Sequence, residues 1–95
     1  MFARIGTYDV PEGEGEAVKE AFRVALGMIQ ELPGFLDASL LLACEGGRAM
    51  TITFWEDRNA MSASRVAATR LRSEAARAVD GEVVAAVEYE VVPLD

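Results

Sequence analysis

Three side chains that could hold a flat aromatic ligand alternate along one short stretch, at Thr51, Thr53 and Trp55. Successive residues of a strand point to opposite faces, so these three share a face, about 7 Å apart from one to the next. An indole can stack on an aromatic ring, and hydroxyls can hydrogen-bond to phenol or carbonyl oxygens. Tyr8 and Tyr89 offer further hydroxyls, and an arginine downstream could stabilise an oxyanion. The residue types therefore make this face a candidate binding site.

Each of these residues also has a purely structural interpretation. Trp55 could be a core anchor, since large aromatic side chains dominate core energetics. The threonines are good strand formers, and the arginines fit the solvated face of a helix. Cys44, the only cysteine, has at most Arg48 as a basic neighbour, which predicts an inert thiol. Residue type alone leaves both interpretations open.

The first element needed to position these residues is a hairpin centred on Gly46–Gly47. Two glycines between apolar runs can supply the positive φ angles of a two-residue turn. With that turn, Glu45 lies opposite Arg48, and Ala38 lies opposite Trp55. The hairpin therefore pairs two opposite charges beside the turn and the largest side chain with a small one.

The other elements follow from periodicity. The chain is predicted to form a strand over residues 2–10, a helix from about 15 to 32, two hairpin strands within 33–57, a helix from 57 to 80 and a strand over 83–92. Apolar residues three to four positions apart predict one buried face on each helix. Asp57 can cap the second helix, whose buried side is mostly alanine, and Ser62 to Ser64 allow a break within it.

This order predicts an α+β fold of the ferredoxin-like βαββαβ type. Right-handed crossovers place both helices on one face of a four-stranded antiparallel sheet. The other face would carry Leu41, Met50, Ile52 and Phe54. An apolar patch of this kind marks an interface, and a second copy related by two-fold symmetry is the simplest cover. We therefore expect a homodimer, the alternative being that these residues are ordinary scattered surface hydrophobes.

Composition excludes several classes of protein. The 95 residues predict one domain, over residues 1–95. A net charge of −7 argues against nucleic acid as a partner, and no apolar run approaches the length of a membrane span. One cysteine and no signal-peptide pattern suggest the cytoplasm. With no histidine and no glycine-rich phosphate loop, we expect no metal, haem or flavin cofactor.

The chain resembles the antibiotic biosynthesis monooxygenase family of the dimeric α+β barrel superfamily. The resemblance lies in the order of elements, in Pro33-Gly34-Phe35 before the second strand and in Phe54-Trp55-Glu56-Asp57 after the third. It covers nearly the whole chain and is most specific between residues 31 and 60. It implies a homodimer formed through the sheet face away from the helices, and a site in the cleft between sheet and helices of each subunit. Members include cofactor-free quinone-forming oxygenases and haem-degrading enzymes.

The site residues of the quinone-forming members are matched only in part by this chain. Their tryptophan at the end of the third strand matches Trp55, while their asparagine four residues earlier falls on Thr51. Their tyrosine in the second helix falls on Met61, and an arginine further along has Arg72 and Arg77 as its nearest counterparts. The asparagine, helix tryptophan and haem-ligating histidine of the haem-degrading members have no counterpart, which argues against that subgroup.

The resulting hypothesis is a cofactor-independent monooxygenase that oxidises a small aromatic or polyketide-like substrate in the cleft. Such an enzyme must hold a flat molecule, stabilise its anion and exclude water. We expect catalytic roles for Trp55, Thr51 and Arg72, and substrate binding by Trp55, Thr53, Met61 and Tyr8. Trp55 is expected to line an open cleft. A non-catalytic small-molecule-binding dimer and a purely structural subunit are the alternatives, which an apolar cleft or a filled cleft, respectively, would favour.

Overall fold

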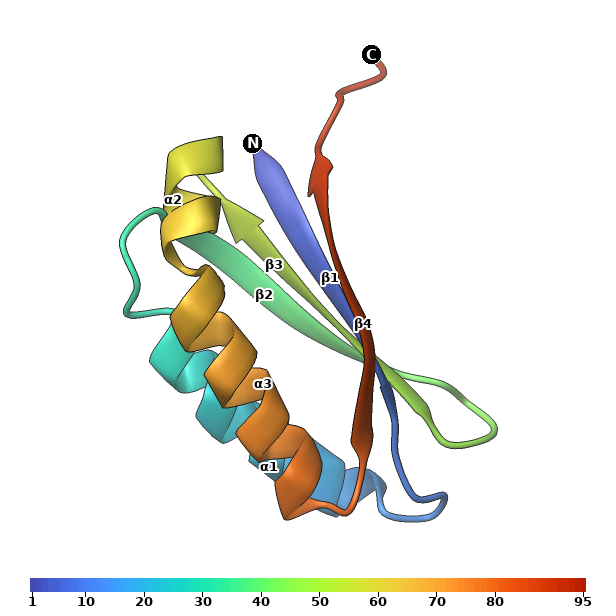
Figure 1. The fold of residues 1–95 in the computed structure, drawn as a ribbon. Helices are drawn as coiled ribbons and strands as arrows, with labels where there is room; N and C mark the ends of the chain where they lie inside the picture. The colour runs from blue at the N-terminus through green and yellow to red at the C-terminus, as the bar shows by residue number, and fades with distance from the viewer.

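The computed structural model describes residues 1–95 and has the predicted order of elements, with the second helix divided in two (Figure 1). The elements are β1 (Phe2–Asp9), α1 (Gly15–Ile29), β2 (Phe35–Leu42), β3 (Arg48–Trp55), α2 (Arg58–Ala63), α3 (Arg65–Ala78) and β4 (Glu82–Glu90). The strands form one antiparallel sheet in the order β2-β3-β1-β4. All helices lie against one face of this sheet, so the predicted ferredoxin-like fold is confirmed.

Helix α1 forms because its apolar residues recur at helical spacing. Val18, Phe22, Ala25 and Ile29 are buried against the sheet, as the periodicity predicts. The helix ends three residues before the predicted end, and tighter turns follow it up to Gly34. Gly34 has a φ of 80°, which favours glycine. That positive φ reverses the chain into β2.

The second helical segment begins and breaks where the sequence indicates. The Asp57 side chain accepts a hydrogen bond from the Ala60 N–H at 2.8 Å, so the predicted N-cap is confirmed. The break falls at Ser64, between α2 and α3. At the far end, the chain leaves α3 through Asp80, whose φ is 58°, and the Gly81 N–H donates to the Ala76 carbonyl at 2.8 Å. Both ends of this segment are therefore set by local backbone chemistry.

The hairpin turn is longer than predicted, and the register of β2 against β3 differs by two residues. Leu42 lies opposite Ala49, and the Ala43 N–H donates to the Arg48 carbonyl at 2.9 Å. The turn is therefore the four residues 44–47, and the predicted two-residue turn is wrong. Arg48 does not lie opposite residue 45.

A long-range contact explains the longer turn. The Val10 N–H donates to the Gly47 carbonyl at 2.8 Å, and a Cβ atom at Gly47 would collide with the Val10 carbonyl. This contact holds Gly47 against the end of β1. Arg48 pairs with Asp9 of β1 at 2.9 Å, so the predicted pairing of Arg48 with Glu45 is corrected. The turn is thus positioned by β1 as well as by its own glycines.

The change of register does not alter which side chains of the paired hairpin residues face the helices. Ala38 lies opposite Thr53, not opposite Trp55 as predicted, and Leu40 lies opposite Thr51. Because side chains alternate with a period of two, a shift of two residues leaves the side chains of residues 38–42 and 49–55 on their predicted faces. The threonines therefore face the helices.

An irregularity at the start of β2 changes which aromatic group reaches the core. Both Phe35 and Asp37 pair with consecutive residues of β3, so Leu36 is skipped and 49 % exposed. Phe35 turns toward the helices and meets Trp55 edge-on, with ring centroids 5.7 Å apart. The bulge therefore adds an aromatic neighbour to Trp55.

The face of the sheet away from the helices is apolar. Residues on it that are half-buried or exposed include Ile5, Leu41, Met50, Ile52, Phe54, Val87 and Tyr89. Strand β4 is an edge strand and is exposed along almost its whole length. None of the helices combines the length and the apolarity needed to cross a bilayer.

Candidate active site

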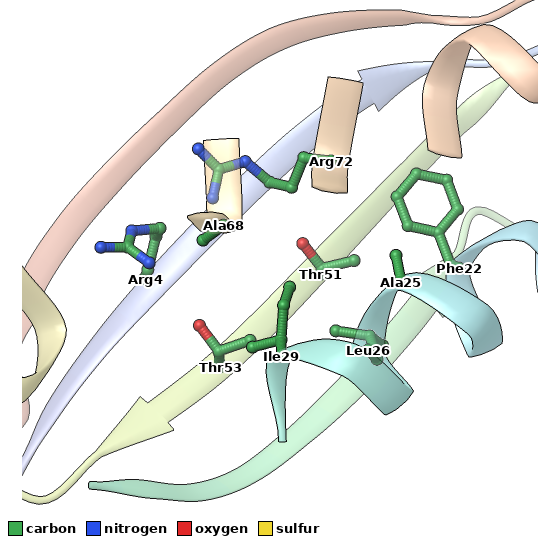
Figure 2. A pocket seen from close by; sticks show the side chains of 9 residues that line it. All are labelled: Arg4, Phe22, Ala25, Leu26, Ile29, Thr51, Thr53, Ala68 and Arg72. Carbon is green, nitrogen blue, oxygen red and sulfur yellow. The ribbon is translucent and has the colours of Figure 1, made fainter. Parts of the chain in front are cut away.

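A small enclosed cavity lies between the sheet and the helices, where the cleft was predicted (Figure 2). Its lining comes from three sources: Arg4, Thr51 and Thr53 on the strands, Phe22, Ala25, Leu26 and Ile29 on α1, and Ala68 and Arg72 on α3. Its free volume of about 10 Å³ is close to that of a single water. The expected open cleft is therefore a nearly filled cavity, the outcome expected above for a purely structural subunit. Its lining nevertheless has an apolar side on α1 and a polar side on the sheet and α3.

Arg72 contributes to this cavity a buried cation that makes no ion pair. The side chain is 8 % exposed, and its Nη2 donates to Thr69 Oγ1 at 3.2 Å. Its Nε is the only buried side-chain nitrogen or oxygen in the protein without a hydrogen-bond partner, and no carboxylate pairs with it. Burial lowers the pKa of Arg72, and the nearby Arg4 acts in the same direction, while Tyr8 and Glu88 act in the opposite direction. A buried donor of this kind favours a bound anion.

Thr51 is held in place by a buried tyrosine. The hydroxyls of Tyr8 and Thr51 are 2.8 Å apart, and the Tyr8 ring packs on Phe22 with centroids 4.7 Å apart. Gly6 leaves the space for this contact, since a Cβ atom there would collide with the Tyr8 hydroxyl. Burial raises the pKa of Tyr8, which keeps its phenol neutral. Tyr8 thus lies behind Thr51 and orients its hydroxyl.

Trp55 is completely buried and does not border the cavity. Its indole N–H donates to Thr53 Oγ1 at 3.0 Å, so its one polar atom is satisfied within the protein. The Arg4 guanidinium lies over the indole, 5.9 Å from the ring centroid, and Phe35 contacts it edge-on. The structure therefore differs from the expected open position of Trp55, because Phe35 and Arg4 cover the ring.

Arg4 is a site residue that the sequence analysis missed. It is 3 % exposed, and each of its side-chain nitrogens has a partner. Nε and Nη2 donate to Glu88 Oε2 at 3.2 and 2.7 Å. Nη1 donates to Ser64 Oγ at 3.1 Å, and Nη2 donates to the Met61 carbonyl at 2.8 Å. Arg4 alternates with Gly6 and Tyr8 along the first strand and so shares a face with them, and this alternation was the signal available.

Glu88 is shared between two arginines. Arg65 donates to it at 2.7 and 3.2 Å, in addition to the two bonds from Arg4. The hydrogen bonds from Arg65, and then those from Arg4, lower the pKa of Glu88 to about 2, against the opposing effect of burial. Glu88 therefore remains ionised and anchors β4 to β1 and α3.

The structure brings three of the predicted site residues together at the cavity: Thr51, Thr53 and Arg72. Tyr8 and Trp55 lie one layer behind, each bonded to one of the threonines. The Met61 side chain is buried in the core, and its carbonyl accepts from Arg4. Tyr89 is on the opposite face of the sheet, and Cys44 is exposed in the turn. No three Cys, Asp or Glu side chains converge in a way that could hold a metal ion.

The chain belongs to the antibiotic biosynthesis monooxygenase family, whose model matches residues 1–75. This confirms the family inferred from the sequence. The fold is shared with solved structures that carry different activities. No curated protein matches the chain.

Three such structures are similar over most of the chain. SnoaB, a cofactor-independent oxygenase from Streptomyces nogalater, is 16 % identical with a TM-score of 0.71, over 98 % of this chain and 94 % of its own. The heme-degrader MhuD from Mycobacterium tuberculosis is 28 % identical with a TM-score of 0.70, over 100 % and 98 %. MupZ from Pseudomonas fluorescens is 20 % identical with a TM-score of 0.71, over 92 % and 69 %.

Glu88 should make the fold sensitive to acid. Its pKa of about 2 lies below the ordinary 4.5, so its contribution to stability is complete above pH 4.5 and is lost as the pH falls toward 2. Glu88→Gln should lower the free energy of unfolding at pH 7 by about 1–3 kcal/mol, because Arg4 loses its buried partner. It should also flatten the fall in Tm between these pH values, followed by circular dichroism.

The matched control is Glu74→Gln, which removes the exposed partner of Arg70 on α3. This variant should keep both the wild-type Tm at pH 7 and the wild-type loss of Tm in acid, since exposed pairs contribute little. If Glu88→Gln kept the full acid sensitivity of the wild type, the role assigned to Glu88 would be wrong.

Proposed function

We propose that this protein is a cofactor-independent monooxygenase that oxidises a small aromatic or polyketide-like molecule between the sheet and the helices. The observation that carries the proposal is Arg72, a buried cation without a carboxylate partner, on the same cavity as Thr51 and Thr53. Such a group can stabilise an oxyanion that forms on a bound substrate. Membership of the monooxygenase family, and likeness to the cofactor-independent oxygenase SnoaB, support the reaction class.

Oxidation of a hydroxyanthrone illustrates the chemistry that the site would assist. The substrate CH₂ group loses a proton, and the resulting anion gives electrons to O₂ and forms a carbon–oxygen bond. Loss of water from the hydroperoxide then leaves a carbonyl group. One oxygen atom of O₂ enters the carbonyl, and the other leaves as water with both hydrogens of the CH₂ group. The four electrons lost by the carbon equal the four gained by O₂.

The protein would bind the substrate anion and exclude water. We assign the oxyanion contact to Arg72, with Thr51 and Thr53 as hydrogen-bonding partners of the substrate. A cavity of about 10 Å³ admits no such molecule, so α1 and α3 must separate for binding. In the opened site Trp55 would reach the substrate ring, and Tyr8 and Met61 would complete the binding surface.

A non-catalytic binding protein is the second candidate, and one observation favours it. The cavity lining contains no carboxylate or other side chain that readily accepts a proton at neutral pH. In that case Arg72 would hold an anionic ligand without turnover. Binding and oxygen uptake must therefore be measured separately.

Arg72→Gln tests the enzymatic proposal. With 1,8-dihydroxyanthrone, the wild type should consume one O₂ for each quinone formed, measured with an oxygen electrode and by absorbance. The variant should lose roughly a hundredfold in kcat/KM, as expected for removal of an oxyanion-stabilising group. It should remain folded, because Gln replaces a buried charge that has no carboxylate partner.

The control is Arg70→Gln, an exposed arginine on the same helix that pairs with Glu74. Its oxygen uptake should match that of the wild type. Ligand binding by the wild type without oxygen uptake would favour the binding protein and rule out the enzyme. Oxygen uptake that appears only after haem is added would overturn the cofactor-independent mechanism.

Trp55→Phe tests whether the indole belongs to the site. The change should lower the free energy of unfolding by about 1–3 kcal/mol, because a fully buried ring becomes smaller and its hydrogen bond to Thr53 is lost. If Trp55 contacts the substrate, KM for the hydroxyanthrone should also rise severalfold. A loss of stability with unchanged kcat and KM would remove Trp55 from the site.

We also propose that the protein is a homodimer formed through the uncovered sheet face. Leu41, Val87 and Tyr89 on this face are each about half exposed, and Ile52 lies at its centre between Ile5 and Ser39. A second copy related by two-fold symmetry would cover these residues on both subunits at once.

Ile52→Asp should split this dimer, because the interface would then bury an unpaired charge. Size-exclusion chromatography with light scattering should give twice the chain mass of 10.2 kDa for the wild type and a single chain mass for the variant. Val66→Asp is the matched control, since Val66 lies on α3 and is 84 % exposed. A wild type that runs as a stable monomer at micromolar concentration would contradict the proposal.

A further inference from the structure

A groove of about 370 Å³ lies between α3 and β4, next to the cavity. Its lining residues are Arg4, Arg65, Thr69, Arg72, Ala86, Val87 and Glu88. Arg4 and Arg72 also line the inner cavity (Figure 2), so the groove and the cavity share these two side chains. The groove is therefore the outer approach to the candidate active site.

The groove concentrates positive charge in an acidic protein. It holds three guanidinium groups and one carboxylate, whereas the whole chain carries a net charge of −7. Glu88 is the only counter-charge in the lining and is divided between Arg4 and Arg65. A basic recess on an acidic surface attracts anions that the rest of the molecule repels.

Two of the guanidinium groups can accept an incoming ligand. Arg72 is nine-tenths buried, its Nε has no partner, and its Nη2 is tied to Thr69, which also lines the groove. Arg65 is 57 % exposed, so it can turn toward a ligand. Arg4 gives Glu88 Oε2 two hydrogen bonds, so the carboxylate keeps its pairing with Arg4 when Arg65 moves, and only Oε1 loses its partner.

We propose that this groove is the entrance to the site and binds a carboxylate carried by the substrate, which makes the substrate an aromatic or polyketide-like carboxylic acid. The proposal rests on the function proposed above for the same site. Arg65 binds the carboxylate, since the planar guanidinium fork matches a planar carboxylate. Arg72 keeps the oxyanion contact assigned to it above. Ala86, which lies opposite Gly6 on the helix-facing side of the sheet, offers apolar contact to the adjoining ring. Arg65 is thus a specificity residue for the acid.

The test compares one ligand with and without its charge. A hydroxyanthraquinone carboxylic acid and its methyl ester are already oxidised, so their binding is independent of turnover. By isothermal titration calorimetry at low salt, the acid should bind about tenfold more tightly than the ester. Arg65→Gln should weaken binding of the acid about three- to tenfold and leave the affinity for the ester unchanged. Arg70→Gln, which removes an equally exposed arginine outside the groove, should change neither affinity.

A second variant is expected to have the opposite effect. Glu88→Gln removes the competing carboxylate and should tighten binding of the acid severalfold, measured at a temperature where circular dichroism shows a folded protein. Equal affinity of the wild type for acid and ester would overturn the proposal. Displacement of the acid by inorganic phosphate at the same concentration would make the groove a phosphate site and the carboxylate assignment wrong. Failure of the proposed enzymatic function would appear as absent oxygen uptake, with the difference between acid and ester intact.

Discussion

The structure depends on the burial of Arg4 inside the sheet–helix layer. A guanidinium taken out of water must be matched by acceptors and counter-charge, or its desolvation would cost several kcal/mol. Glu88 of β4 supplies the charge, while Ser64 and the Met61 carbonyl supply the remaining acceptors. That carbonyl lies in the last turn of α2, beside the break at Ser64, and the Arg4–Glu88 pair ties the exposed edge strand to the centre of the sheet. Trp55 is covered by the same side chain.

The two buried arginines differ in whether the protein itself satisfies all of their hydrogen-bond donors. Every side-chain nitrogen of Arg4 has a partner, so this residue needs no ligand. Arg72 is nearly as deeply buried, yet it has one weak neutral partner and one orphaned nitrogen. Both arginines line the same cavity, but only Arg4 has all of its hydrogen-bond donors satisfied by the protein. An anion would therefore bind more favourably to Arg72 than to Arg4.

Local patterns allowed much of this architecture to be predicted from the sequence. Alternation placed Thr51 and Thr53 toward the helices, and the Asp57 cap and the break at Ser64 followed from side chains that compete for backbone groups. The missed features all depend on distant contacts. The turn length reflects the contact between Gly47 and Val10, and the partner of Arg4 lies 84 residues away. The size of the cavity follows from side-chain packing, which no local pattern encodes.

The four-residue turn at 44–47 limits how this hairpin can change in evolution. A slip of β3 by one position would turn Thr51 and Thr53 outward. A residue gained or lost in the turn avoids this slip only if the loop absorbs it, with the Ala43 N–H still bonded to the Arg48 carbonyl and Gly47 still held against Val10. Homologous turns of other lengths are therefore compatible with the site as long as the residues that correspond to Ala43 and Arg48 remain paired.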